Sequence, residues 1–144
     1  MSAARAGEAA TTHRARVVWR GDRADIRAHS IELAGQVIEG SSQSELGGDP
    51  CKADPEELFV ASLSACHMLW FLDHARRERI RVADYEDQAE GSMDGARFTR
   101  VVLRPRVSTE RPVDDGLLEA LHARAHEDCF IANSVSCAVE VESR

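Results

Sequence analysis

The sequence DPEELFVASLSACHMLWFL, residues 54–72, decides the fold that we predict for this chain. Its first residues carry the signals that begin a helix. Asp54 can cap the free amides of the first turn, and Pro55 suits the first helical position because it has no N–H group to satisfy. Glu56 and Glu57 complement the positive end of the helix dipole. A helix is therefore predicted to begin at Pro55.

The middle of the same stretch is apolar on every side. Residues 58–72 carry no permanent charge, which indicates a helix that is enclosed rather than one that lies on a surface. These fifteen residues are too few for an easy membrane crossing, which needs about 20. The charged residues 73–81 then return the chain to solvent. We expect a buried central helix that ends near Leu72, with Cys66 close to its middle, and no membrane partner.

Length and charge narrow the class of protein. The chain has 144 residues and a net charge of −7, so it lacks the broad basic surface of a nucleic-acid binder, and no nucleic-acid partner is expected. The first residues lack the apolar core of a secretory signal, which predicts a soluble cytoplasmic protein. We expect a disordered tail over residues 1–11 and a single domain over residues 12–144.

Three strands are predicted before the central helix. They cover residues 14–19, 23–29 and 30–39, and Gly35 interrupts the third. Residues 40–54 are rich in Gly, Ser, Asp and Pro, as expected of a long loop that delivers the chain to the helix. The opening third is therefore predicted to be an antiparallel meander.

The second half predicts a hairpin, a helix and a closing strand. The turn signal Asp94-Gly95 indicates that the strands on either side of it pair directly. Asp114 or Asp115 should cap the second helix. The elements predicted here are strands at residues 82–93 and 97–108, a helix that starts within residues 112–116 and ends near Cys129, and a strand at residues 134–142. The predicted fold is α+β, with the order βββαββαβ and a mainly antiparallel sheet.

The four cysteines do not fit a secreted disulfide scaffold, because they are few and irregularly spaced; they are Cys51, Cys66, Cys129 and Cys137. Cys66 and Cys129 each lie inside or at the end of a predicted helix. If they met in space, one thiolate could attack an electrophilic oxygen or sulfur, and the other could close a disulfide. A buried Cys66 would need a positive neighbour such as Arg to become a thiolate. By composition alone, a cysteine in an apolar helix is more often a small core residue.

Two segments resemble the two cysteine motifs of the OsmC and organic hydroperoxide resistance family: PEELFVASLSACHM around Cys66 and AHEDCFIANSV around Cys129. The order of elements also agrees with that family from about Arg14 to Val141. The resemblance implies an intertwined homodimer that reduces organic hydroperoxides, takes electrons from an external dithiol and needs no cofactor. It implies a peroxidatic Cys66, a resolving Cys129 and an orienting carboxylate at Glu56.

The family also uses an arginine from its N-terminal strands to hold the thiolate. This chain offers Arg20, Arg23 and Arg27 there, and we favour Arg27, in the sequence DIRAH. His67 follows Cys66 where the best-known branches have an aromatic residue, and Phe130 follows Cys129 where they often have proline. The chain therefore differs from those branches next to both cysteines.

The spacing of Glu56 and Cys66 limits how they can act together. Ten residues of continuous helix separate them by about 15 Å along the axis, which is too far for a hydrogen bond. Glu56 must therefore act through an interposed arginine or reach the Cys66 of another subunit. The hypothesis is a site shared between two subunits.

The histidines support an alternative reading. His122, His126 and Cys129 stand at positions i, i+4 and i+7, so one helix could present them on one face. Cys66 or His67 could then complete a tetrahedral zinc site. The alternative function is a zinc- or small-ligand-binding protein without turnover.

Overall fold

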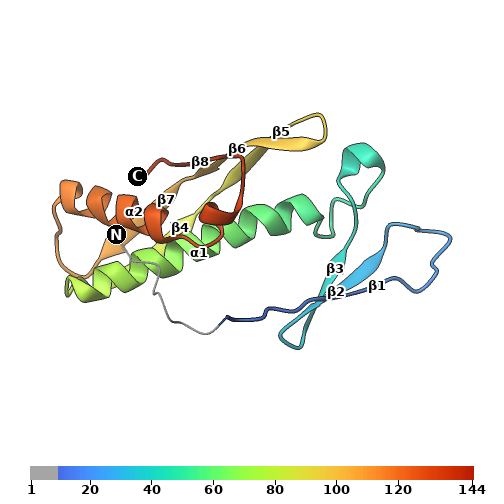
Figure 1. Cartoon of the computed structure of the whole chain (residues 1–144), viewed down its shortest axis with the longest axis horizontal. Helices are drawn as coiled ribbons and strands as arrows, with labels where there is room; N and C mark the ends of the chain where they lie inside the picture. Colours follow the sequence, from blue (N-terminus) through green and yellow to red (C-terminus); the bar gives the residue numbers. More distant parts are fainter. Residues whose placement is uncertain (1–9) are drawn as a thin grey trace. The chain divides into compact units, whose positions relative to one another are not determined.

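Helix α1, Pro55–Arg77, is the longest element of the computed structural model, which describes residues 10–144 (Figure 1). Its first turn is closed by a reciprocal capping box. The Glu57 amide donates to Asp54 Oδ1 at 2.7 Å, and the Asp54 amide donates to Glu57 Oε1 at 3.0 Å. The predicted start and cap are confirmed. The helix runs beyond Leu72 because its charged last turn places basic side chains at the negative end of the dipole.

The end of α1 carries an unusual residue for its conformation. The Arg79 amide donates to the Arg76 carbonyl at 3.0 Å, and the Ile80 amide donates to the Ala75 carbonyl at 2.9 Å. This is a Schellman motif, whose left-handed position is most often glycine. Here that position is Arg79, with φ of 58°.

In the single chain, α1 is buried along one face, whereas its sequence predicts enclosure on every side. The buried residues are Leu63, His67, Phe71, His74 and Ala75. Leu69, on another face, is 62% exposed. Among the described residues, α1 is the one helix long and apolar enough to cross a membrane, although the core helix of a soluble protein has the same length and composition.

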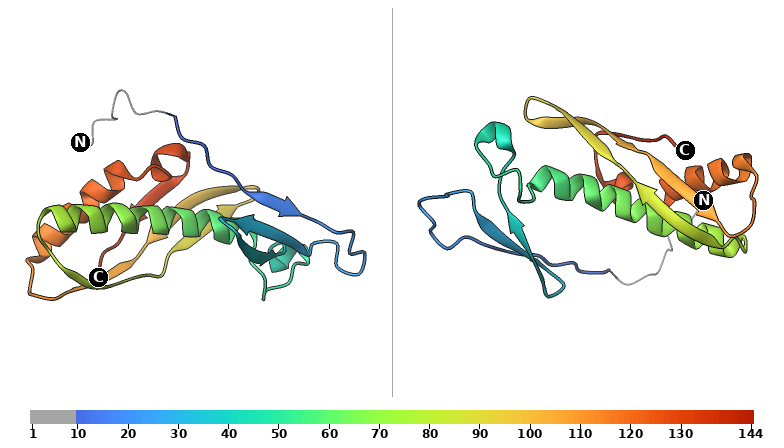
Figure 2. Two further views of the ribbon diagram at one scale, coloured as in Figure 1. Left: turned by 90° about the horizontal axis from the view of Figure 1, so that it is seen from below. Right: turned by 180° about the vertical axis from the view of Figure 1, so that it is seen from behind.

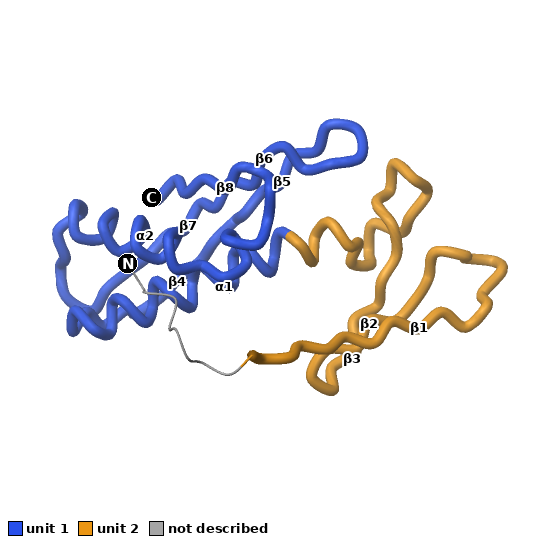
Figure 3. Tube along the Cα trace, in the orientation of Figure 1, with its two compact units in different colours: residues 1–4, 60–144 blue, residues 5–59 orange. Residues whose placement is uncertain are grey.

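The chain divides into two compact units (Figure 3). Unit 2 spans Arg5–Phe59, and its described part holds an antiparallel sheet in the order β1-β2-β3. The strands are β1 Arg16–Val18, β2 His29–Leu33 and β3 Gln36–Gly40. Unit 1 is described over Val60–Arg144. The prediction of a single domain over residues 12–144 stays a prediction, and most of the predicted tail, residues 1–9, lies outside the described residues.

Two of the three N-terminal strand predictions were wrong in their limits. The segment predicted as a strand at residues 23–29 bends instead, because Asp22 Oδ1 accepts hydrogen bonds from the amides of Ala24 and Asp25. The segment at residues 30–39 is a hairpin rather than one interrupted strand. Ala34 and Gly35 both have positive φ, 50° and 78°, and form its two-residue turn.

The loop before α1 closes on itself and on β3. The Ser41 amide donates to the Ala53 carbonyl at 2.9 Å, and the Ala53 amide donates to the Glu39 carbonyl at 3.1 Å. Ser41 is buried, and its hydroxyl accepts a hydrogen bond from the Asp49 amide at 3.0 Å. A short 3₁₀ helix, η1, Ser44–Leu46, lies at the tip. These contacts hold the start of α1 beside the end of β3.

Unit 1 contains two sheets, with β4 and β7 paired in one and the order β5-β6-β8 in the other. The strands are β4 Val82–Asp87, β5 Glu90–Asp94, β6 Arg97–Leu103, β7 Pro105–Thr109 and β8 Ala138–Val141. The predicted hairpin about Asp94-Gly95 is confirmed, but each of its long arms divides in two. The second arm divides at Arg104, just before Pro105, and the Arg104 amide donates at 2.6 Å to Oδ1 of Asp87, where the first arm divides. The closing strand β8 is shorter than predicted and runs parallel to β6.

The second helix, α2, Asp115–Asp128, lies beside α1 (Figures 1 and 2). The Asp114 side chain caps it by accepting from two amides, as predicted. A 3₁₀ turn, η2, Ala132–Ser134, follows. The core cluster of unit 1 consists of Phe71, Ala75, Leu121 and Ala125, with side chains from β4 and β7 packed against it. The α+β fold is confirmed, and the intertwined dimer stays a prediction.

Candidate active site

Cys66 and Cys129 meet inside unit 1. Cys66 lies on α1 and is partly exposed, whereas Cys129 is the C-cap residue of α2 and is 1% exposed. Their thiols lie close enough for Cys66 to raise the pKa of Cys129, although the residues are far apart in the sequence. The fold therefore brings together the two cysteines that the sequence singled out, both as free thiols.

The Cys129 thiol is held in its protonated form. Burial raises its pKa to about 11, and the nearby Cys66 thiol adds to the rise. The Ala132 amide donates to Cys129 Sγ at 3.4 Å, which favours the thiolate but only partly offsets burial. At neutral pH Cys129 is therefore a thiol, and a weak nucleophile until a base removes its proton.

The residues on both sides of Cys129 contact α1. Asp128 Oδ2 lies 2.7 Å from His74 Nε2, and both side chains are buried. The Phe130 ring meets the Trp70 ring edge-on, with centroids 5.3 Å apart. These contacts were not predicted from the sequence. The one available signal was that His74 and Asp128 are polar residues near the ends of the two predicted helices.

A second pair of histidines lies in the same core. His67 Nε2 and His122 Nδ1 are 3.0 Å apart, and the two rings are stacked with centroids 5.3 Å apart. Burial lowers the pKa of His67 to about 3, and the nearby His122 and His126 lower it further. Burial also lowers the pKa of His122 to about 4. Both imidazoles are therefore neutral at physiological pH.

The predicted zinc set does not assemble. Over residues 10–144, no group of three or more His, Cys, Asp or Glu side chains has an arrangement suited to a metal ion. His67 and His122 direct a nitrogen at each other rather than at a common point. The structure thus gives no support to zinc ligation by His122, His126 and Cys129.

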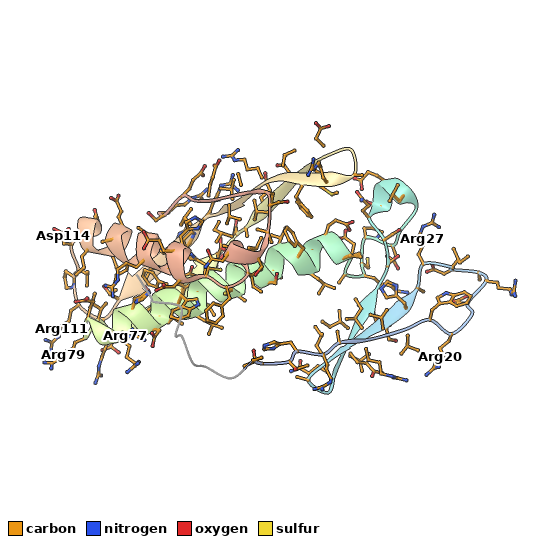
Figure 4. All side chains as sticks on the ribbon, viewed as in Figure 1. Arg20, Arg27, Arg77, Arg79, Arg111 and Asp114 are labelled. Carbon is orange, nitrogen blue, oxygen red and sulfur yellow. The ribbon has the colours of Figure 1, made fainter. Side chains whose placement is uncertain are left out.

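The predicted charged partners, Arg27 and Glu56, belong to unit 2. They line one open pocket of about 310 Å³, together with residues of the loop before α1. Glu56 Oε2 is buried and has no hydrogen-bond partner among the described residues. The Arg27 guanidinium lies against Gly47, where an added Cβ would come within 3.4 Å of Cζ. Figure 4 shows Arg27 beside the turn that holds η1, whereas Arg20 lies in the loop between β1 and β2.

Local structure explains why Arg27 lies at this pocket. Its amide donates to Asp25 Oδ1 at 3.2 Å, and its carbonyl lies 2.7 Å from His29 Nδ1, so the backbone on both sides is fixed. The His29 ring covers Gly40, where a Cβ would come within 2.4 Å of Nε2. Of the three candidate arginines, Arg27 is the one that shares a pocket with Glu56.

Comparisons with known proteins agree with this fold. The family model described as OsmC-like protein matches residues 47–144. An OsmC-like protein of unknown function from Vibrio cholerae is 35% identical, with 94% of this chain and 100% of that chain covered and a TM-score of 0.83. An organic hydroperoxide resistance protein OsmC from Legionella pneumophila is 25% identical, with 94% and 97% covered and a TM-score of 0.71.

A third structure shares the fold at lower identity. The organic hydroperoxide resistance protein OhrB of Bacillus subtilis is 21% identical, with 91% of this chain and 98% of that chain covered and a TM-score of 0.63. A comparison with curated proteins gives no match.

Proposed function

Because the chain belongs to the OsmC-like protein family, we propose that it is a peroxide-stress protein that reduces organic hydroperoxides with Cys66 and Cys129. The observation that carries the proposal is the contact between the two thiols within unit 1. Two of the similar structures are organic hydroperoxide resistance proteins, which supports the peroxide-stress part of the proposal.

The environments of the two cysteines support different roles. Cys66 is the more exposed of the pair, so a peroxide reaches it more easily. Cys129 is buried and its pKa is raised, so it is poorly suited to the first attack. We assign Cys66 as the peroxidatic cysteine and Cys129 as the resolving cysteine.

The proposed cycle balances without a cofactor. The Cys66 thiolate attacks one peroxide oxygen, the O–O bond breaks, and the alkoxide takes a proton and leaves as an alcohol. Cys66 is then a sulfenic acid. The Cys129 sulfur attacks Cys66 Sγ, the S–O bond breaks, and the hydroxyl group leaves as water with the proton of Cys129. An external dithiol reduces the disulfide, and a cytoplasmic location would supply such a reductant.

Arg27 and Glu56 are proposed to activate the thiolate in a homodimer. Helix α1 is unbroken from Glu56 to Cys66, so these residues of one chain are about 15 Å apart along it. We propose that Arg27 and Glu56 of one copy serve the Cys66 of a second copy. Large apolar side chains of unit 2 support an association, since Val17, Ile26 and Val37 are each more than 60% exposed.

Thiol counting under anaerobic conditions tests the cycle. Replacing Cys51 and Cys137 by serine leaves a background with two thiols. One equivalent of cumene hydroperoxide should then remove both thiols from this background, none after Cys66→Ser, and one after Cys129→Ser, with dimedone trapping the sulfenic acid. Two intact thiols after peroxide treatment of the background would reject the proposed function.

A further inference from the structure

Cys129 is held to the helix of Cys66 by its two sequence neighbours. Asp128 precedes Cys129 and contacts His74 at 2.7 Å, and Phe130 follows it and packs against Trp70. His74 and Trp70 both lie on α1, about two turns and one turn after Cys66. Any movement of the end of α2 away from α1 would therefore have to break these contacts.

We propose that the hydrogen bond between His74 and Asp128 positions Cys129 for disulfide closure with Cys66, which makes His74 a positioning residue. The inference rests on the proposed thiol chemistry and adds a residue that acts through the backbone of Cys129 rather than on the reacting sulfurs. We call the pair of His74 and Asp128 the clamp.

The proton positions in the clamp follow from its neighbours. Arg124 Nη2 lies 3.3 Å from His74 Nδ1, and a guanidinium has donors only, so Nδ1 accepts. The imidazole proton is therefore on Nε2 and is donated to Asp128 Oδ2. Arg124 is itself fixed by Glu78 Oε1 at 3.1 Å. Both ring nitrogens of His74 thus have partners, and the ring has one fixed orientation.

Disulfide formation is sensitive to this kind of restraint. The bond forms only within a narrow range of Cβ separations and dihedral angles. A side chain adjacent to Cys129 that is fixed against α1 keeps the two sulfurs in range and raises their effective concentration. Without the clamp, the thiols would spend less time within bonding distance, and the disulfide would be easier to reduce.

A thiol–disulfide equilibrium measures this effect without peroxide. The full-length protein with Cys51→Ser and Cys137→Ser is equilibrated anaerobically with reduced and oxidised dithiothreitol, and the Cys66–Cys129 disulfide is quantified by mass spectrometry. In this exchange, reduced dithiothreitol becomes its cyclic disulfide as the protein disulfide becomes two thiols. His74→Leu should lower the equilibrium constant for protein disulfide formation about tenfold, or ~30 mV.

Conservative substitutions separate positioning from general stability. His74→Gln keeps an N–H group where Nε2 stands, so its constant should stay within about threefold of the parent. Asp128→Asn keeps the shape and an acceptor oxygen but loses the charge, and should lower the constant about threefold. Asp128→Asn carries the test if circular dichroism shows that His74→Leu does not fold.

Asp73→Ala is the matched control on the same helix. Asp73 pairs with Arg76 and Arg77 at the surface, at 3.0 and 2.8 Å, and its loss should leave the constant unchanged. The proposal is overturned if folded His74→Leu, or Asp128→Asn in its place, has the same equilibrium constant for disulfide formation as the parent. It is also overturned if Asp73→Ala lowers that constant as much as the clamp variant does.

The clamp and the proposed function fail in different ways. A parent protein that forms the disulfide in dithiothreitol but ignores cumene hydroperoxide rejects the peroxidase, while the ratio between variants still tests the clamp. If the parent consumes peroxide but all variants have the same equilibrium constant for disulfide formation, the clamp alone is rejected. A parent that forms no Cys66–Cys129 disulfide in oxidised dithiothreitol overturns the clamp.

Discussion

His67 and His122 meet in the core of unit 1 as two neutral imidazoles that share one hydrogen bond. Their pKa values of about 3 and about 4 lie below the value of about 6.5 expected in the unfolded chain. Between these values the unfolded chain binds more protons than the folded one. The free energy of unfolding is therefore not reduced by these histidines above pH 6.5, and it decreases as the pH falls toward 4 and then 3.

Acid titration of stability tests the histidine pair. At pH 5 each histidine should have removed up to ~2 kcal/mol from the free energy of unfolding. His67→Gln keeps a hydrogen-bonding N–H group but removes one titrating group. The number of protons taken up on unfolding between pH 4.5 and 6, which sets the slope of stability against pH, should therefore fall by about one. Urea unfolding across this range measures the slope.

A matched histidine substitution serves as the control. His13→Gln removes an exposed histidine of unit 2, and a fall in the slope as large as that of His67→Gln would assign the effect to the loss of any histidine. An unchanged slope for His67→Gln would show that the pair is not the source of acid sensitivity.

At the scale of elements, a substitution at the end of α1 should stabilise the protein. Arg79 has φ of 58°, a conformation that glycine adopts at lower cost than any residue with a Cβ. Arg79→Gly should therefore raise the free energy of unfolding by ~0.5–1 kcal/mol, measured by urea or thermal unfolding. The comparison is Arg79→Ala, which removes the guanidinium but keeps the Cβ. An equal gain from Arg79→Ala would assign the effect to charge instead of backbone strain.

Elements with local signals were predictable from the sequence. The caps at Asp54 and Asp114 depend on residues within one turn and were found as predicted, whereas the hairpin predicted at Asp94-Gly95 turns one residue later, at Gly95-Ala96. The hairpin turn at Ala34-Gly35 was not recognised, because alanine rarely adopts positive φ.

Contacts between distant residues could be predicted only in part. The cysteine pair was inferred by resemblance, and the structure places the two thiols in contact. The pairing of His74 with Asp128 joins residues 54 positions apart, and the alternation of apolar residues does not specify such a contact. The alternative of a zinc site gains no support from the described residues, since helical spacing aligns side chains on a face without directing their nitrogens to one point.

At the scale of the whole molecule, mixing two inactive variants tests the proposed shared site. A copy with Glu56→Gln retains Cys66, and a copy with Cys66→Ser retains Glu56. If each site combines residues of two copies, the mixed dimer has one complete site and should recover about half of the parent activity per dimer. Differently tagged copies are co-expressed and purified in tandem, and peroxide consumption is measured with a dithiol reductant.

The control for this mixture removes the complementing residue. A copy that carries both Cys66→Ser and Glu56→Gln, mixed with the Glu56→Gln copy, should recover no activity. If the first mixture also stays inactive although mixed dimers are isolated, then Glu56 serves the thiol of its own chain. If the Glu56→Gln copy is active by itself, then Glu56 does not serve the thiol.

The parallel pairing of β8 with β6 has a consequence for the order of folding. The β5–β6 hairpin joins neighbours in the sequence and can form within microseconds, whereas β8 pairs with β6 only after α2 has been made and placed. Until then, one edge of β6 is unpaired where Val101, Val102 and Leu103 lie in the finished core. We expect nascent or partly unfolded chains to aggregate through this edge, and the completion of β8 to end that risk.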